Sequence, residues 1–300
     1  MNLLVTGAVA LTEDKKNMLK KLGHEVVFMQ QENSPLPCTA TWVEGIIGNG
    51  IFLHHPIEQF TSLQYIQLTS AGFDRVSMDY VKEQGIVLHN ARGVYSIPMA
   101  EFALGGVLQL YKQSHFFYEN KKEKRWEKHR QLLELFGKKV CILGCGSVGT
   151  ECAKRFGAFG CEIVGVDLVP HNGTEYTAVL PLEKMDEAIE NSDIVVLTLP
   201  LCKETHHLFN REKFEKMKPG AVLVNIARGG IVDTEALVEA LTGKLYGAVL
   251  DVFEEEPLAD NHILWHMENV MITPHNSFVG EGNIKRLTDV ILNNIEEYSK

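Results

Sequence analysis

The chain has 300 residues and a formal net charge of −10, from 29 Lys and Arg against 39 Asp and Glu. Hydrophobic residues make up 45% and charged residues 23%, ordinary globular proportions that exclude a disordered or fibrous chain. The acidic balance argues against a broad surface for nucleic acid or anionic membranes, and no apolar run approaches the ~18 residues of a membrane span. The apolar start precedes the first lysine, Lys15, the reverse of a secretory signal. We therefore expect a soluble cytoplasmic protein, long enough for two domains, with no nucleic-acid or membrane partner.

The first third of the chain alternates β-rich runs with helical periodicity. A helix is predicted at 12–22, and strands at 2–6, 25–29, 45–47, 64–68 and 85–88. Residues 98–112 form a helix that begins with Pro98 and is apolar over much of its surface. The mixed-charge segment 119–130 is interpreted as a solvated helix end and connecting loop, in preference to a contact with RNA or phosphate.

The alternation then restarts and continues along the rest of the chain. Strands are predicted at 139–143, 162–166, 193–199, 221–226, 247–250 and 270–273, and helices at 147–159, 182–190, 211–217, 233–242 and 283–298. The last helix places Ile284, Leu287, Ile291, Ile295 and Tyr298 on one face. Strands that alternate with helices form βαβ units, so the fold class is α/β with mostly parallel sheets.

The six cysteines follow no metal or disulfide spacing, because none belongs to a CxxC pair. Four of them crowd one segment: Cys141, Cys145, Cys152 and Cys161. We expect small, mostly buried, reduced thiols and no metal site.

The segment 139–167 carries a dinucleotide fingerprint. An apolar strand runs into Gly144-x-Gly146-x-x-Gly149, and a helix follows at once. Gly144 permits the tight turn, Gly146 lets a pyrophosphate approach the backbone, and Gly149 allows the helix to pack closely on the strand. The helix N-terminus offers free N–H groups and the positive end of a dipole to the phosphates.

A second apolar strand ends in Asp167, a residue that can discriminate between NAD and NADP. Its carboxylate can accept hydrogen bonds from both ribose hydroxyls and would repel a 2′-phosphate. After Leu168, the next cationic side chain is Lys184. The sequence therefore predicts NAD in preference to NADP.

Each of three later strands is followed by a polar side chain. These side chains lie at the carboxyl ends of the strands, where open α/β sheets bind their ligands. Arg228 follows the strand at 221–226, Asp251 ends the strand at 247–250, and His275 follows the strand at 270–273. Glu256 lies near Asp251, directly before Pro257. An arginine, a carboxylate and a histidine beside a dinucleotide suit a small anion with a carbonyl group.

With these residues the chain resembles the D-isomer-specific 2-hydroxyacid dehydrogenases, which include phosphoglycerate, glycerate and D-lactate dehydrogenases. The resemblance covers nearly the whole chain, in TSAGFD at 69–74, HNARGVYSIPMAE at 89–101, the fingerprint at 144–149, LPLCKETHHLFN at 199–210, MKPGAVLVNIARGG at 217–230, LDVFEEEP at 250–257 and TPH at 273–275. It implies reversible hydride transfer between NAD(H) and a small D-2-hydroxy acid or its 2-oxo partner.

The resemblance also implies the roles of individual residues. Arg228 would hold the substrate's oxo and carboxylate oxygens, His275 would be the general acid/base paired with Glu256, and N–H groups around Ala71 and Gly72 would bind the carboxylate. Glu254 and Glu255 adjoin Glu256, and the family's acid stands directly before the proline, so we choose Glu256. The implied cofactor contacts are Gly144, Gly146, Ser147, Val148, Gly149, Asp167, Leu199, Pro200, Thr205, Ile226, Ala227, Arg228 and Asp251, the last lying near the nicotinamide.

The family's connectivity implies two doubly wound domains, of Rossmann and flavodoxin-like type, with a cleft between them. Residues 1–97 plus 277–300 would bind substrate, and 98–276 would bind NAD. The helix at 98–112 would help to form a homodimer. A second class of function stays open: C-terminal-binding-protein corepressors resemble these enzymes and use dinucleotide occupancy to govern partner contacts.

Overall fold

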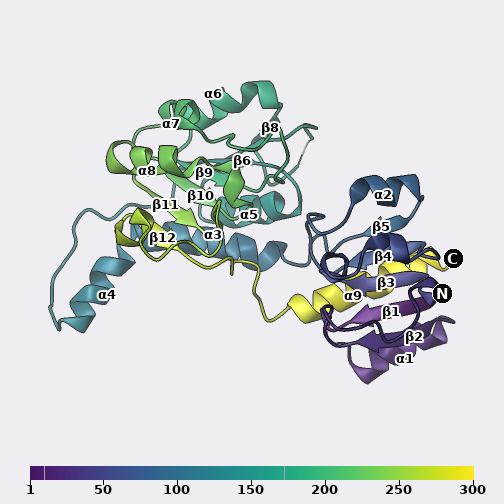
Figure 1. Ribbon diagram of the computed structural model, residues 1–300. Coiled ribbons are helices and arrows are strands. Elements are labelled where there is room, and N and C mark those ends of the chain that lie inside the picture. The colour runs from purple at the N-terminus through teal and green to yellow at the C-terminus, as the bar shows by residue number, and fades with distance from the viewer. Residues whose placement is uncertain (10, 172) are drawn as a thin grey trace. The chain divides into compact units, whose positions relative to one another are not determined.

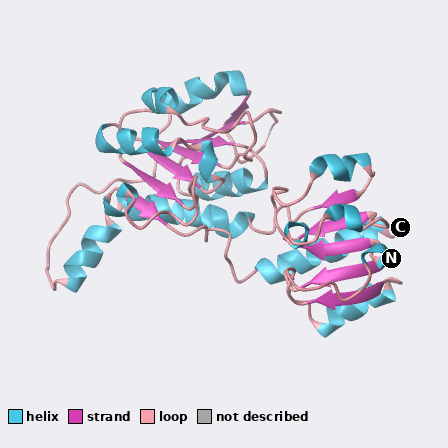
Figure 2. Ribbon diagram, in the orientation of Figure 1, coloured by secondary structure: helices cyan, strands magenta, loops and turns pink. Residues whose placement is uncertain are grey.

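A computed structural model of the protein describes residues 1–9, 11–171 and 173–300, in which the chain separates into two compact units (Figure 1). Unit 1 comprises Met1–Tyr95 and Gly280–Lys300, and unit 2 comprises Ser96–Val279. Each unit contains one parallel sheet with apolar clusters on both of its faces, and helices surround each sheet (Figure 2). The predicted α/β class with doubly wound parallel sheets is confirmed.

Unit 1 has a five-stranded sheet in the order β2-β1-β3-β4-β5, the order of flavodoxin-type sheets. Its strands are β1 (Asn2–Thr6), β2 (Glu25–Met29), β3 (Gly45–Gly48), β4 (Tyr65–Leu68) and β5 (Val87–His89). Its helices are α1 (Glu13–Lys21), α2 (Met78–Glu83) and α9 (Asn283–Tyr298), with 3₁₀ turns at Ala40–Trp42, Ile51–Leu53 and Ile57–Gln59. Leucine and isoleucine side chains of α1 and α9 cover one face, and Val81 of α2 packs on the other.

The predicted face of α9 is only partly correct. Leu287, Ile291 and Ile295 are buried against the sheet, and Tyr298 packs beside them. Ile284 is 61% exposed, because it lies in the first helical turn, before the turns that contact the sheet. The strand predicted at 85–88 also begins later, at Val87, since Gly85 has a φ of 66° and forms part of the turn after α2.

Unit 2 has a seven-stranded sheet in the order β12-β11-β10-β9-β6-β7-β8, and every pairing is parallel. Its strands are β6 (Lys139–Leu143), β7 (Glu162–Val166), β8 (Ala178–Leu180), β9 (Ile194–Leu197), β10 (Val222–Asn225), β11 (Gly247–Leu250) and β12 (Val270–Ile272). Helices α3 (Ser96–Tyr111) and α5 (Ser147–Ala158) cover one face. Helices α6 (Met185–Glu190), α7 (Arg211–Lys216) and α8 (Thr234–Gly243) cover the other.

Short elements of unit 2 depart from the sequence prediction. The helix expected at 182–190 is a 3₁₀ turn, Leu182–Lys184, followed by α6. The strand β8 was not predicted, because its three residues are too few to show a period. Helix α4 (Ser114–Lys122) follows α3 closely, ends inside the mixed-charge segment and lies away from the sheet of its unit, and a long loop connects it to β6 (Figure 1).

No helix in the part of the chain that the structure describes is long and apolar enough to cross a membrane.

A buried histidine joins the two chain ends within unit 1. His24 is 6% exposed, its Nδ1 lies 3.2 Å from the amino group of Met1, and its Nε2 lies 3.3 Å from Oγ of Ser299. Burial, aided by the positive amino group, lowers the pKa of His24 below its usual value.

We predict that this histidine makes unit 1 sensitive to acid. The unfolded chain takes up the proton first, near the ordinary His pKa of about 6.5, so stability is lost as pH falls through that value toward the lower folded one. The thermal midpoint should therefore fall between pH 7 and pH 5, and less so in His24→Gln. His54→Gln, at an exposed position in the same unit, is the control. Equal pH dependence in all three proteins would contradict the prediction.

Candidate functional site

The parallel arrangement brings the carboxyl ends of the unit 2 strands to one edge of the sheet. The order of the strands reverses between β6 and β9, where open α/β sheets bind ligands. The predicted residues follow these ends: Gly144 after β6, Asp167 after β7, Leu199 and Pro200 after β9, Arg228 after β10, Asp251 after β11 and His275 after β12. Segments far apart in sequence thus share one edge.

Two of the three fingerprint glycines, Gly144 and Gly149, satisfy a steric need. Gly144 has a φ of 95°, and a Cβ there would lie 3.0 Å from the carbonyl of Thr198. A Cβ at Gly149 would lie 2.1 Å from the carbonyl oxygen of Gly144, so only glycine lets α5 pack this closely on the loop. Gly146, the N-cap of α5, faces open space instead. The backbone at this helix N-terminus is therefore open, and helix N-termini are sites where anions bind.

The carboxylate of Asp167 lies against the fingerprint loop. Its Oδ2 accepts from the backbone N–H of Cys145 at 2.7 Å, and its Oδ1 accepts from the N–H of Val169 at 3.2 Å. Each oxygen keeps a further lone pair for a ribose hydroxyl. Thr198, which sequence reasoning missed, donates from Oγ1 to the carbonyls of Leu143 and Gly144, at 3.0 and 2.6 Å, and so holds the loop from the β9 side.

The remaining predicted cofactor residues differ in what they can offer. Ser147 and Val148 lie half-buried in the first turn of α5. The side chains of Ile226 and Ala227 are buried. Leu199 and Pro200 lie in the loop after β9, where Oγ1 of Thr205 donates to the carbonyl of Pro200 at 2.7 Å. Thr205 therefore closes the turn from 200 to 205.

Arg228 stands on a loop that two close contacts fix. The buried side chain of Asn225 accepts from the N–H of Ala227 at 3.1 Å and donates to the carbonyl of Arg228 at 3.0 Å. A Cβ at Gly229 would lie 1.9 Å from the carbonyl of Phe253. The loop that carries Arg228 therefore packs directly on the segment that leads to Glu256.

The structure brings the predicted acid/base pair together. Nδ1 of His275 lies 2.9 Å from Oε2 of Glu256, whose Oε1 accepts from the N–H of Phe253 at 3.0 Å. In the described part of the chain, Nε2 of His275 has no hydrogen-bond partner. His275 has a φ of 51°, an uncommon value for a residue with a side chain and one that often marks active sites.

Asp251 holds His275 in that conformation. Its carboxylate is fully buried and accepts from Oγ1 of Thr273 at 2.7 Å, from the N–H of Asn276 at 2.7 Å and from the N–H of Ser277 at 2.9 Å. The N–H of His275 itself donates to the carbonyl of Asp251 at 2.8 Å. These bonds tie down the residues on both sides of His275, so the carboxylate positions the histidine.

A second carboxylate–histidine contact supports the same segment. Glu254 accepts from the N–H of Thr234 at 2.8 Å and contacts Nε2 of His207. Partial burial alone would raise the pKa of Glu254, but the hydrogen bonds from Thr234 and His207 outweigh it and lower that pKa. The long-range pairing of Glu254 with His207 carries no signal in the sequence.

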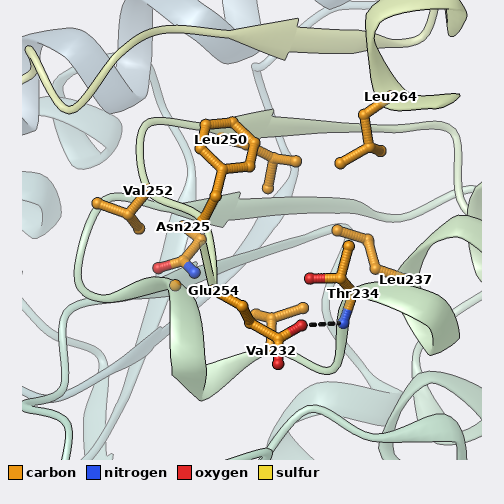
Figure 3. A pocket seen from close by; sticks show the side chains of 10 residues that line it. Asn225, Val232, Thr234, Leu237, Leu250, Val252, Glu254 and Leu264 are labelled. Carbon is orange, nitrogen blue, oxygen red and sulfur yellow. Dashed lines mark hydrogen bonds between the residues drawn. The ribbon is translucent and has the colours of Figure 1, made fainter. Parts of the chain in front are cut away.

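Glu254 also borders a small, mostly apolar pocket, whose lining includes Asn225, Leu250 and Leu264 (Figure 3).

Unit 1 presents the backbone donors that the sequence singled out. Asn90 Nδ2 donates to the carbonyl of Ala71 at 2.6 Å, and Oγ of Ser70 donates to the carbonyl of Gly72 at 3.0 Å. Within the described ranges, the N–H groups of Ala71 and Gly72 donate to no partner. The loop after β4 is therefore fixed through its carbonyls while two N–H groups stay available.

All six cysteines are free thiols. Among the residues that the structure describes, no group of three or more His, Cys, Asp or Glu side chains is arranged to hold a metal ion.

Residues 104–277 match the family model for the D-isomer specific 2-hydroxyacid dehydrogenase, NAD binding domain. The chain belongs to the D-isomer-specific 2-hydroxyacid dehydrogenase family. Both the predicted family and the predicted cofactor, NAD, are confirmed.

Curated relatives and solved structures agree with this assignment. This 2-hydroxyacid dehydrogenase family member is 34% identical over 244 residues to D-3-phosphoglycerate dehydrogenase of Methanocaldococcus jannaschii, covering 80% of this chain and 46% of that protein. It is 38% identical over 222 residues to glyoxylate reductase of Thermofilum pendens, covering 71% of this chain and 65% of that protein. The chain thus matches less than two thirds of either relative's length. The structure of D-lactate dehydrogenase from Aquifex aeolicus, complexed with NAD and lactic acid, matches with a TM-score of 0.79 at 26% identity, covering 99% of this chain and 95% of that one.

Two glycine substitutions should separate cofactor binding from folding. Gly146→Ala adds a methyl group in open space, so the thermal midpoint without cofactor should stay unchanged while NADH binds on the order of tenfold more weakly. Gly149→Ala should lower the midpoint itself, because its Cβ meets a backbone oxygen. Fluorescence titration with NADH and thermal melting measure both. Unchanged NADH affinity in Gly146→Ala would show that no pyrophosphate approaches this residue.

Proposed function

We propose that the protein is an NAD-dependent oxidoreductase that transfers a hydride between NAD(H) and a small D-2-hydroxy acid or its 2-oxo partner. The observation that carries this proposal is the His275–Glu256 pair, 2.9 Å apart, on the sheet edge that also carries Arg228 and the dinucleotide fingerprint. Relatives named as phosphoglycerate dehydrogenase and glyoxylate reductase support the same reaction class.

The proton chemistry of the proposed reaction falls to His275. NADH supplies the hydride when bound. Glu256 holds Nδ1, so Nε2 is the ring nitrogen that can give a proton to the carbonyl oxygen during reduction and take it back during oxidation. Glu256 also stabilises the imidazolium, which favours reduction.

Substrate oxygens would be bound by donors of different shapes. The planar guanidinium of Arg228 matches a carbonyl and a carboxylate oxygen side by side, which a lysine ammonium cannot reproduce. The N–H groups of Ala71 and Gly72 suit the second carboxylate oxygen. In this proposal both sets of donors hold the anion, while His275 alone moves a proton.

The cofactor contacts follow from the fingerprint. We assign the pyrophosphate to the loop from Gly144 to Gly149, including the N–H groups of Ser147 and Val148, and the ribose to Asp167. Leu199, Pro200, Thr205, Ile226, Ala227, Arg228 and Asp251 are assigned as further contacts. The carboxylate of Asp167 would repel a 2′-phosphate, so NADH should be preferred over NADPH.

We further propose that residues 98–276 bind NAD, that 1–97 with 277–300 bind the substrate, and that the protein is a homodimer. Helix α3 packs against α5 and the sheet of its own unit, which leaves only part of its apolar surface available. The segment after α4 exposes Trp126 by 98%, a large apolar side chain that a second copy would cover. Sedimentation measurements test the dimer.

The test of the proposed function is NADH oxidation with a panel of 2-oxo acids. Glyoxylate, hydroxypyruvate, pyruvate, phosphohydroxypyruvate and branched 2-oxo acids cover the family's range of side chains. Turnover with one of them, lost by about 10²–10⁴-fold in His275→Ala, supports the proposal. Tight NADH binding without turnover of any acid would instead favour the dinucleotide-sensing role of the corepressor type.

The choice among three adjacent glutamates is testable through the rate of reduction. Reduction needs a proton delivered from Nε2 of His275, whose Nδ1 lies 2.9 Å from Oε2 of Glu256. Glu256→Gln keeps a polar partner at Nδ1 but removes the negative charge beside the ring, so kcat for reduction should fall on the order of tenfold or more while the fold and the NADH affinity are kept. Glu255→Gln, an exposed neighbour, is the matched control. A lower kcat in Glu255→Gln alone would contradict the assignment.

Asp251→Asn should distinguish positioning of His275 from contact with the cofactor. An amide places an N–H₂ group against one of the backbone N–H donors that the carboxylate now accepts from. Because the loop then loses its fixed geometry, kcat should fall on the order of tenfold or more. NADH affinity should hardly change if Asp251 acts through His275. A large loss of NADH affinity with kcat preserved would favour the cofactor contact instead.

A further inference from the structure

In unit 1, the loops after two neighbouring strands each contain a pair of adjacent backbone N–H groups. The two pairs differ in whether the protein supplies a hydrogen-bond acceptor for them. After β4, the N–H groups of Ala71 and Gly72 donate to no partner within the described ranges. After β3, the N–H groups of Asn49 and Gly50 both donate to the carboxylate of Glu32, each at 2.7 Å. One pair is therefore available to an anion, and the other already holds one.

Glu32 is fixed firmly in this place. Its Oε1 also accepts from Oγ1 of Thr6, at the end of β1, at 2.7 Å. The carboxylate thus spans the gap between the ends of β1 and β3, where the strand order of this sheet reverses. Such a reversal is where a flavodoxin-type sheet binds an anionic ligand. A side chain of the protein occupies the position that a phosphate or carboxylate could take.

The N–H groups of Asn49 and Gly50, which Glu32 occupies, lie one strand away from the N–H groups of Ala71 and Gly72. β3 and β4 are hydrogen-bonded neighbours, Gly48 is opposite Leu68, and the N–H of Thr69 donates to the carbonyl of Gly48 at 2.9 Å. Adjacent strands are about 4.8 Å apart. A small acid held by its carboxylate at Ala71 and Gly72 therefore lies beside the strand whose end Glu32 occupies, and the negative charge of Glu32 repels a second anionic group that extends from that acid toward β3.

We propose that Glu32 is a specificity-determining residue that selects against 2-oxo acids with a second anionic group. This inference rests on the proposed function, since it takes the substrate carboxylate to bind after β4. The glutamate acts in two ways: its charge repels a distal carboxylate or phosphate, and its oxygens occupy the N–H groups that would bind one. Acids with an uncharged side chain meet neither obstacle.

The positive charge of Arg75 opposes this effect. The side chain of Arg75 is exposed, and its Cδ comes within 3.9 Å of the position that a Cβ at Gly50 would take. Its guanidinium is accessible to water and screened by salt, whereas Glu32 is half-buried and held by three hydrogen bonds. We therefore expect the carboxylate to dominate the selection.

The experiment compares 2-oxopentanoate with 2-oxoglutarate, which have the same chain length and differ in the distal charge. For the wild-type protein, kcat/KM should favour 2-oxopentanoate by about tenfold or more, and salt should reduce the preference through screening. A wild-type preference for 2-oxoglutarate would show that Arg75 dominates and would overturn the proposal.

Three variants complete the design. Glu32→Gln removes the charge and should reduce the preference by about tenfold, mainly through the KM for 2-oxoglutarate. Glu32→Ala also frees both N–H groups and should reduce the preference further. Glu25→Gln makes the same charge change at the opposite end of the sheet, at the start of β2, and should leave the preference unchanged. An equal effect of Glu25→Gln, or none of Glu32→Gln, would overturn the proposal.

Two further measurements keep the outcome decisive. Should the Glu32 variants fail to fold, the salt dependence of the wild-type preference decides, and a preference independent of ionic strength contradicts the role of the charge. Absence of turnover with every 2-oxo acid would contradict the proposed function alone. Binding of both acids in the presence of NADH, followed by thermal shift, then decides the selectivity, and equal binding overturns it.

Discussion

The buried carboxylate of Asp251 is the constraint on which the geometry of unit 2 depends most. A fully buried carboxylate is costly unless hydrogen bonds satisfy it, and here the donors are Thr273 and the backbone at Asn276 and Ser277. Each donor belongs to the loop after β12, so satisfying the charge fixes the loop. The left-handed conformation of His275 persists because the residues on both sides are held. An electrostatic requirement in the core thus sets the direction of an exposed imidazole.

Close backbone packing also fixes the loops that neighbour the loop after β12. Gly229 lies so near Phe253 that the loop of Arg228 and the segment of Glu256 cannot move independently. Glu254 ties that segment to the start of α8 and to His207. The three candidate catalytic side chains come from different strand ends, yet their backbones contact one another through this segment. The positions of these side chains at the sheet edge of unit 2 are therefore fixed by contacts between the loops more than by any single side chain.

Much of the fold, and the cofactor side of the site, could be predicted because their signals are local. The spacing of Gly144, Gly146 and Gly149 predicts a strand, a turn and a helix within one stretch of sequence, and the structure has them. The strand β8 has only three residues, too few to show a period. The bonds of Asp251, and the pairing of Glu254 with His207, join residues whose proximity depends on sheet order. Ile284 shows the same limit, since periodicity gives a face but not where contact with the sheet begins.

The two N–H pairs of unit 1 show how a common scaffold acquires selectivity. Parallel strands end at one edge whatever their sequence, so donors for anions arise there repeatedly. What differs between strand ends is whether the chain satisfies those donors itself. Glu32 reaches them from the loop after β2, two positions along the sheet, with Thr6 as its third donor. An internal carboxylate at one strand end and open N–H groups at the next make neighbouring positions opposite in their preference for charge. The protein's own anion then limits which second charge the edge can accept.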